Sequence, residues 1–146
     1  VVLLLVWGLV RRNAELIRAA FGLLVLLALV TLVVQLTGEP AEELVEGLPG
    51  VLDSIVERHE EAALIGTIGM SGLALLALFG WWRSRGGRTL ARWYPGVVLI
   101  GGLLLSGYFG WVANLGGQIR HSEIRPGQAA ALSAEEQTTE RRGEED

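Results

Sequence analysis

The chain has 146 residues, of which 51% are hydrophobic, and it has no cysteine and a formal net charge of −4. This length suits one small domain, and its charged residues are confined to short blocks between long apolar runs. A core of this size cannot bury several uncharged runs of about 20 residues, so the composition excludes a water-soluble globular protein. We therefore predict an all-α integral membrane protein.

The first apolar run, residues 1–10, is too short to span a bilayer. We predict that it is the second half of a transmembrane helix whose first half is not represented; a short interfacial segment is the alternative. Uncharged runs follow at 19–36, 62–82 and 94–115, each close to the roughly 17–25 residues that cross a hydrocarbon layer of about 30 Å. Residues 1–127 are therefore predicted to form an antiparallel four-helix transmembrane bundle with a truncated first helix.

An acidic segment, residues 37–61, separates the second and third runs and contains eight carboxylates but only one arginine, Arg58. Pro40 and Pro49 both suit the first turn of a helix, and apolar residues recur every three to four positions from Val51 onward. We predict an amphipathic outer helix that begins near Pro49 and continues into the membrane as one rod. The polar, charged tail 128–146 is predicted to be disordered.

The other short connections are rich in arginine, and such loops stay in the cytoplasm. These arginines are Arg11, Arg12, Arg18, Arg83, Arg85, Arg88 and Arg92. The acidic segment and the C-terminus are then outside, in the arrangement expected for a multi-pass protein of the bacterial inner membrane. Aromatic residues bracket the second arginine loop, as they do at the headgroup level of a bilayer; they are Trp81, Trp82, Trp93 and Tyr94.

Both histidines of the chain, His59 and His121, fall at predicted outer ends of helices. Below each of them runs a row of small residues that lets another helix, or a flat ligand, approach the backbone closely. The row under His59 consists of Ala62, Ala63, Gly66 and Gly69, followed by Met70. The row under His121 consists of Gly102, Ser106, Gly110, Asn114 and Gly117.

Two histidines on facing helices predict a candidate site for haem b, with His59 and His121 as axial ligands. Its candidate lining residues are Gly66, Gly110, Asn114 and Gly117. The alternative is close helix packing, with the histidines solvated or hydrogen-bonded to a carboxylate such as Glu123. A further alternative is a divalent metal held by His59, His121, Glu60 and Glu123, although their spacing is not that of a zinc motif.

Two stretches resemble parts of an uncharacterised family of four-helix bacterial inner-membrane domains. The family has a His-Phe-Pro-Ile segment opening helix one, a histidine before helix three, and a Gly-Gly-x-Leu-Val-Tyr-like end of helix four. "VERHEEAALIGTIG" is similar to the second feature, with His59 at the family's histidine. "NLGGQIRHSEIRPG" is similar to the third, with different residues after its paired glycines, Gly116 and Gly117. The resemblance implies the fold and topology but no activity, and the first feature would precede residue 1.

The predicted spans contain no ionisable group that would mark a transport pathway, and no nucleophile motif frames a serine near either histidine. The basic residues border the membrane, so nucleic-acid binding is not expected. We expect a small non-catalytic subunit of a larger bacterial respiratory or photosynthetic electron-transfer complex, in contact with lipid and other membrane subunits. The alternatives are a b-type haem electron-transfer protein acting in its own right and a divalent-metal-binding membrane protein.

Overall fold

The computed structural model describes residues 1–43, 52–85, 90–121 and 124–125. In this part of the chain the regular elements are all helices: α1 (Val2–Val10), α2 (Ala14–Glu43), α3 (Asp53–Arg83) and α4 (Tyr94–Arg120). The last three are each long and apolar enough to cross a membrane. The predicted apolar runs coincide with these helices apart from Val1, which precedes α1, so the predicted all-helical fold with three helices of membrane-spanning length and composition is confirmed.

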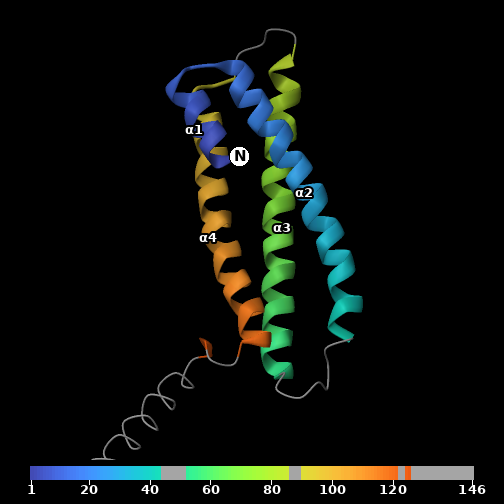
Figure 1. Cartoon of the computed structure of the whole chain (residues 1–146). Coiled ribbons are helices and arrows are strands. Elements are labelled where there is room, and N and C mark those ends of the chain that lie inside the picture. Colours follow the sequence, from blue (N-terminus) through green and yellow to red (C-terminus); the bar gives the residue numbers. More distant parts are fainter. Residues whose placement is uncertain (44–51, 86–89, 122–123, 126–146) are drawn as a thin grey trace, which may run out of the picture.

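The helices run side by side and alternate in direction (Figure 1). The α1–α2 turn lies at the same end as the end of α3 and the start of α4. We call this the arginine end, because it carries Arg11, Arg12, Arg18, Arg83, Arg85 and Arg92. The opposite end, with the start of α3 and the end of α4, is called the His59 end. α3 packs against both α2 and α4, and the short α1 packs against α2 and α4.

A tight turn joins α1 to α2. The side-chain oxygen of Asn13 accepts hydrogen bonds from the backbone N–H groups of Glu15 at 2.9 Å and Leu16 at 3.2 Å. Asparagine is a favoured helix N-cap because it satisfies amides that have no partner inside the helix. Arg12, just before it, has φ 51°, a left-handed conformation that is uncommon for a residue with a side chain. The turn thereby reverses the chain within three residues.

α2 extends further than its apolar run, through Pro40 to Glu43. The expectation that Pro40 lies in the first turn of a helix is therefore wrong. The proline removes the hydrogen bond to the carbonyl four residues before it, and its ring crowds that carbonyl, but only one turn of helix follows it. α3 begins at Asp53, ahead of its apolar run, and continues unbroken to Arg83, as the single-rod prediction requires; Pro49 lies outside the described residues.

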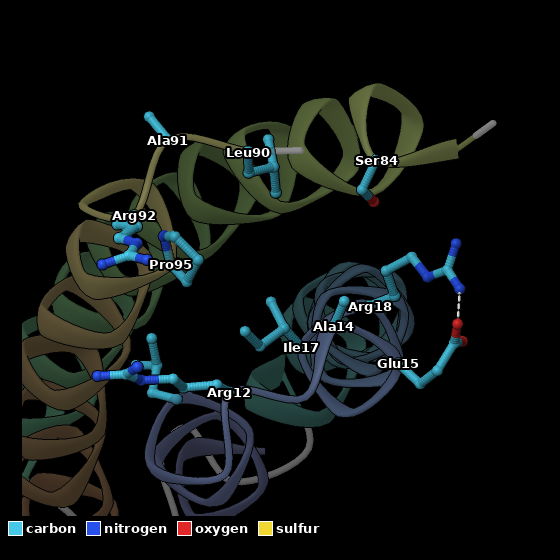
Figure 2. A pocket seen from close by; sticks show the side chains of 11 residues that line it. Arg12, Ala14, Glu15, Ile17, Arg18, Ser84, Leu90, Ala91, Arg92 and Pro95 are labelled. Carbon is cyan, nitrogen blue, oxygen red and sulfur yellow. Dashed lines mark hydrogen bonds and ion pairs between the residues drawn. The ribbon is translucent and has the colours of Figure 1, made fainter. Parts of the chain in front are cut away.

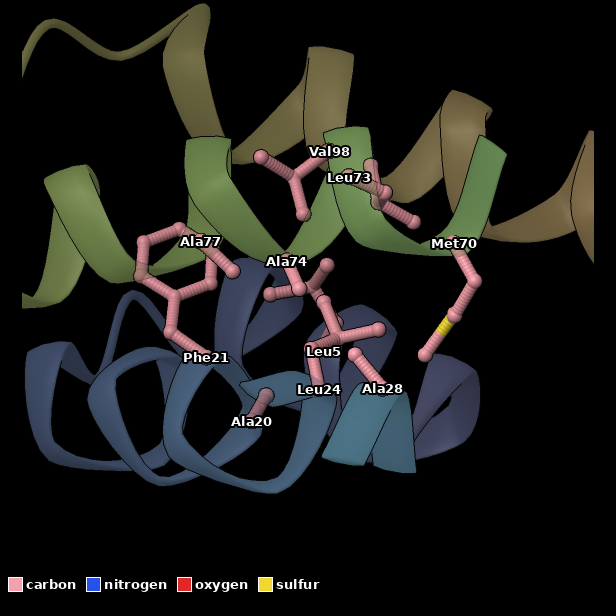
Figure 3. Packing of buried hydrophobic residues seen from close by; sticks show 10 residues of the cluster. All are labelled: Leu5, Ala20, Phe21, Leu24, Ala28, Met70, Leu73, Ala74, Ala77 and Val98. Atoms are coloured by element: carbon pink, nitrogen blue, oxygen red, sulfur yellow. The ribbon is translucent and has the colours of Figure 1, made fainter. Parts of the chain in front are cut away.

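The main core lies between α2 and α3, with one contribution each from α1 and α4 (Figure 3). Phe21 is fully buried and meets Tyr94 edge-on with ring centroids 6.2 Å apart. Gly80 of α3 makes room for these rings, since a Cβ there would lie 2.6 Å from Phe21 Cε2 and 2.7 Å from Tyr94 Cε1. The Tyr94 hydroxyl donates to the Leu76 carbonyl at 2.6 Å. Aromatic packing thus joins three helices near the arginine end.

Large aliphatic side chains cover the outside of the bundle; examples are Leu29, Val33, Ile68, Leu75 and Leu104. In water such a surface would drive association or aggregation. In a bilayer the same side chains meet hydrocarbon, and the helices satisfy their own backbone hydrogen bonds. The exposed apolar surface and the three long helices therefore both favour a membrane environment.

Candidate functional site at the His59 end

His59 lies on the face of α3 that packs against α4, as its position on the apolar stripe predicts. Its ring is half-buried, whereas its neighbours Glu57, Arg58, Glu60 and Glu61 are exposed. The ring Nδ1 lies 3.1 Å from the backbone carbonyl oxygen of Val112 in α4. The histidine therefore joins the two helices by a contact between a side chain and a backbone group.

The Val112 contact fixes which ring nitrogen carries hydrogen. A carbonyl oxygen can only accept, so the Nδ1 of His59 must donate for this hydrogen bond to form. In a neutral ring the other nitrogen, Nε2, is then the one with a free lone pair. A metal-binding histidine commonly has this arrangement, with one nitrogen donating to a carbonyl and the other facing the ion.

Gly116 of α4 provides the space for the imidazole. A Cβ at Gly116 would lie 3.0 Å from His59 Cε1, 3.4 Å from Nδ1 and 3.5 Å from Nε2. Any larger residue at this position would therefore push the ring away from α4. Of the two adjacent glycines, Gly116 faces His59, whereas the nearest atom to a Cβ at Gly117 is Ile124 Cδ1, at 3.4 Å.

The glycine face of α3 beneath His59 is filled by aromatic side chains from α4. A Cβ at Gly66 would lie 2.8 Å from Phe109 Cε1 and 3.3 Å from Tyr108 Cε1. The Tyr108 hydroxyl donates to the Ala62 carbonyl at 3.1 Å. The small residues of α3 thus serve helix packing, and the space that a flat ligand would need next to Gly66 is taken by these rings.

His121 has a different environment. α4 continues through Gly116 and Gly117 to Arg120, and His121 is its C-cap, with its backbone N–H bonded to the Gly117 carbonyl at 3.0 Å. The residue is exposed. The structure therefore places one predicted haem ligand inside a helix interface and the other on the surface beyond the end of α4.

The predicted metal ligands do not form a site within the described residues. No group of three or more histidine, cysteine, aspartate or glutamate side chains there is placed to hold a metal ion. Glu60 is exposed, and Glu123 lies outside the described residues.

The row of small residues predicted on α4 divides into two parts. Gly102 is buried, with Val2 of α1 and Leu73 of α3 nearest to it. Ser106, Gly110 and Asn114 are exposed, and a Cβ at Gly110 would meet nothing within 4 Å in the described structure. Ser106 nevertheless borders a space that residues of the other three helices also line, so the open part of the row lies at Gly110 and Asn114.

The residues of α4 that do face the His59 end of α3 are Tyr108, Val112 and Gly116, which the prediction missed as packing residues. They repeat every four residues, two positions along from the predicted row. Gln118, which is buried and donates to Asn114 Oδ1 at 2.8 Å, was also missed. The four-residue spacing of Tyr108, Val112 and Gly116 places them on one face of α4 and could have indicated a packing face. It is less conspicuous in the sequence than a row of small residues.

No protein-family model, curated protein or solved structure matches the chain. The resemblance to a family of four-helix inner-membrane domains therefore stays a prediction.

Proposed function

We propose that the protein is a small non-catalytic membrane subunit that binds another membrane-protein subunit through one exposed face of α4. This α4 small-residue face consists of Ser106, Gly107, Gly110, Ala113 and Asn114, all of them exposed. The observation that carries the proposal is the open space above Gly107 and Gly110. By contrast, Gly66, Gly80 and Gly116 are each covered by a side chain of a neighbouring helix.

The composition of this face suits a transmembrane helix better than it suits lipid. Small residues allow two helix backbones to approach closely, which strengthens van der Waals contact inside a bilayer. Asn114 adds an amide whose described hydrogen bond uses only its oxygen, which accepts from Gln118. The NH₂ group of an asparagine has two hydrogens to donate, and leaving them in hydrocarbon is costly. A partner helix with carbonyl or hydroxyl acceptors would satisfy them.

The cellular setting belongs to the same proposal. The clustering of arginines at one end supports a bacterial inner-membrane protein with that end in the cytoplasm. The acidic segment and the C-terminus would then be outside. A role within a larger electron-transfer complex agrees with the small size of the chain and with helices that use their histidine and glycines for packing.

A b-type haem site is the second candidate function, and the specific observation in its favour is the Nδ1 contact of His59, which leaves Nε2 free to bind iron. The packing of the ring on Gly116, and of Phe109 on Gly66, favours the structural role instead. The two candidates predict different absorption spectra.

Photo-crosslinking in the native membrane tests the proposed interface. A benzophenone amino acid at Gly110 should link the chain to one defined membrane protein, with the adduct mapped to a transmembrane peptide. The same probe at Leu29, exposed on α2, is the matched control and should give lipid adducts. Gly110→Leu should abolish co-purification of the partner without lowering thermal stability, because position 110 is open. Lipid adducts alone from position 110 would refute the subunit proposal, and a link only to a second copy would replace it with a homodimer.

A further inference from the structure

A pocket at the arginine end combines apolar walls with cationic side chains (Figure 2). It has a volume of about 540 Å³ and lies between the α1–α2 turn, the end of α3 and the start of α4. We call it the arginine-end pocket. Its apolar walls include Leu9, Ile17, Leu90 and Pro95. This space is far from the His59 end and plays no part in the proposed subunit interface.

The charge balance of the arginine-end pocket is positive. Arg12, Arg18, Arg92 and Glu15 all line it. Arg18 and Glu15 form an ion pair with each other, so they contribute little net charge. In the view of Figure 2, Arg12 and Arg92 lie on one side of Ile17 and the Arg18–Glu15 pair lies on the other. Among the described residues that line the pocket, the guanidinium groups of Arg12 and Arg92 thereby carry the net positive charge.

The conformation of Arg12 is a second, independent observation. Its φ of 51° places it in the left-handed region, which a residue with a side chain occupies at an energetic cost. Glycine would adopt this conformation without that cost. Residues held in such conformations are concentrated at ligand-binding and functional sites. An arginine therefore occupies a backbone position that favours glycine, at the edge of this pocket.

The position of the pocket indicates what kind of molecule it binds. It lies where the apolar helices end, and the exposed Trp93 and the half-buried Tyr94 directly precede Pro95 in the chain. Aromatic residues are enriched at this headgroup level of a bilayer. A guanidinium group matches a phosphate geometrically and can donate two parallel hydrogen bonds to it. Apolar walls suit the first part of an acyl chain, whereas a free phosphate ion would gain nothing from them. Basic pockets between transmembrane helices bind anionic lipid headgroups for these reasons.

We propose that the arginine-end pocket binds one anionic phospholipid. Arg12 and Arg92 hold its phosphate, and Leu9, Ile17, Leu90 and Pro95 contact the glycerol and the upper acyl chain. The bound lipid bridges the α1–α2 turn to the start of α4. The protein therefore selects a lipid class at its arginine end, whether or not it is a subunit of a larger complex.

Native mass spectrometry of the full chain in detergent, titrated separately with phosphatidylglycerol and phosphatidylcholine, tests the proposal. One phosphatidylglycerol should bind at least about tenfold more tightly than phosphatidylcholine. The double variant R12Q/R92Q should lose that preference, because each charge-assisted hydrogen bond contributes enough for roughly a tenfold change. The matched control is R11Q/R85Q, which removes the same charge at the same end from side chains stacked on Trp7 and Trp81, outside this pocket.

Four outcomes would overturn the proposal. Equal loss in both double variants would mean that only the general surface charge attracts the lipid. Equal binding of the two lipids would remove the headgroup selectivity. Displacement by millimolar inorganic phosphate would indicate a small-anion site. If R12Q/R92Q alters the far-ultraviolet circular dichroism spectrum, R92Q alone replaces it, since Arg92 is exposed and precedes α4. Unchanged lipid preference in R92Q would then be the fourth contradictory result.

Discussion

Replacing His59 tests whether this residue stabilises the contact between α3 and α4 or binds a haem iron. His59→Ala removes the Nδ1 hydrogen bond to the Val112 carbonyl and the ring contact with Gly116. Hydrogen bonds between transmembrane helices contribute about 0.6 kcal/mol on average and roughly 1.7 kcal/mol at most. The lost packing of a half-buried ring adds about 1 kcal/mol. We therefore expect the free energy of unfolding to fall by about 1.5–2.5 kcal/mol.

Two companion variants make the His59 result specific. His59→Gln should recover part of the loss, because a glutamine amide can donate to the same carbonyl. His121→Ala should lower the stability by less than His59→Ala does, since His121 is exposed whereas His59 is half-buried. A shared haem iron would instead make both alanine variants equally damaging in the holoprotein, and glutamine would not rescue His59.

The assay follows separation of α3 from α4 as detergent micelles are titrated with sodium dodecyl sulfate. The chain has no cysteine, so Ser54→Cys and Arg120→Cys, both exposed, introduce a pair of sites for fluorescent labels at the His59 end. Energy transfer between the labels reports the helix contact. Equal stability of wild type and His59→Ala, or equal losses in the His59→Ala and His121→Ala variants, would refute the packing argument.

Three further predictions follow from the same structure. Gly80→Ala should destabilise the bundle by about 1–3 kcal/mol in thermal unfolding, because its new methyl group overlaps the rings of Phe21 and Tyr94. The control Gly72→Ala should unfold close to the wild-type temperature, because nothing lies within 4 Å of a Cβ at Gly72 in the described structure. A reporter active only outside the cytoplasm should work when fused after Asp146 but not when inserted at Gly86, and the reverse pattern would invalidate the orientation. Thr67→Val should cost about 0.5–1.5 kcal/mol in detergent unfolding, because it removes a hydroxyl that lies 3.2 Å from Gln35 Oε1 and 2.9 Å from the Ala63 carbonyl oxygen. No change would show that the contact between Thr67 of α3 and Gln35 of α2 contributes nothing to stability.

The helices themselves were predictable because uncharged runs of membrane length leave few alternatives. The position of His59 on the buried side of α3 was also predictable, since the three-to-four spacing of its apolar neighbours fixes a helix face. Pro40 was misassigned because proline is favoured in the first turn of a helix, whereas the structure places it in the last turn of α2. Sequence alone does not distinguish these two positions when a helix extends past its apolar run.

It was harder to predict which face of each helix packs against a neighbouring helix of the same chain. Ser106, Gly110 and Asn114 indicate a surface that can be approached closely, but not whether the approaching helix belongs to this chain. The structure shows α3 meeting Tyr108, Val112 and other residues of α4 instead. The arginine-end pocket was not predicted at all, because its walls come from three separate parts of the chain. Only the folded arrangement brings Arg12 and Arg92 to the same cavity.

The most direct test of the structural role assigned to His59 is a visible absorption spectrum. The full chain would be expressed with haem precursor, purified from membranes and reduced with dithionite. We predict no Soret band above the background of a His59→Ala control, because the His59 ring packs against α4 and aromatic rings cover Gly66. A Soret band corresponding to one haem per chain, lost in both His59→Ala and His121→Ala, would contradict it.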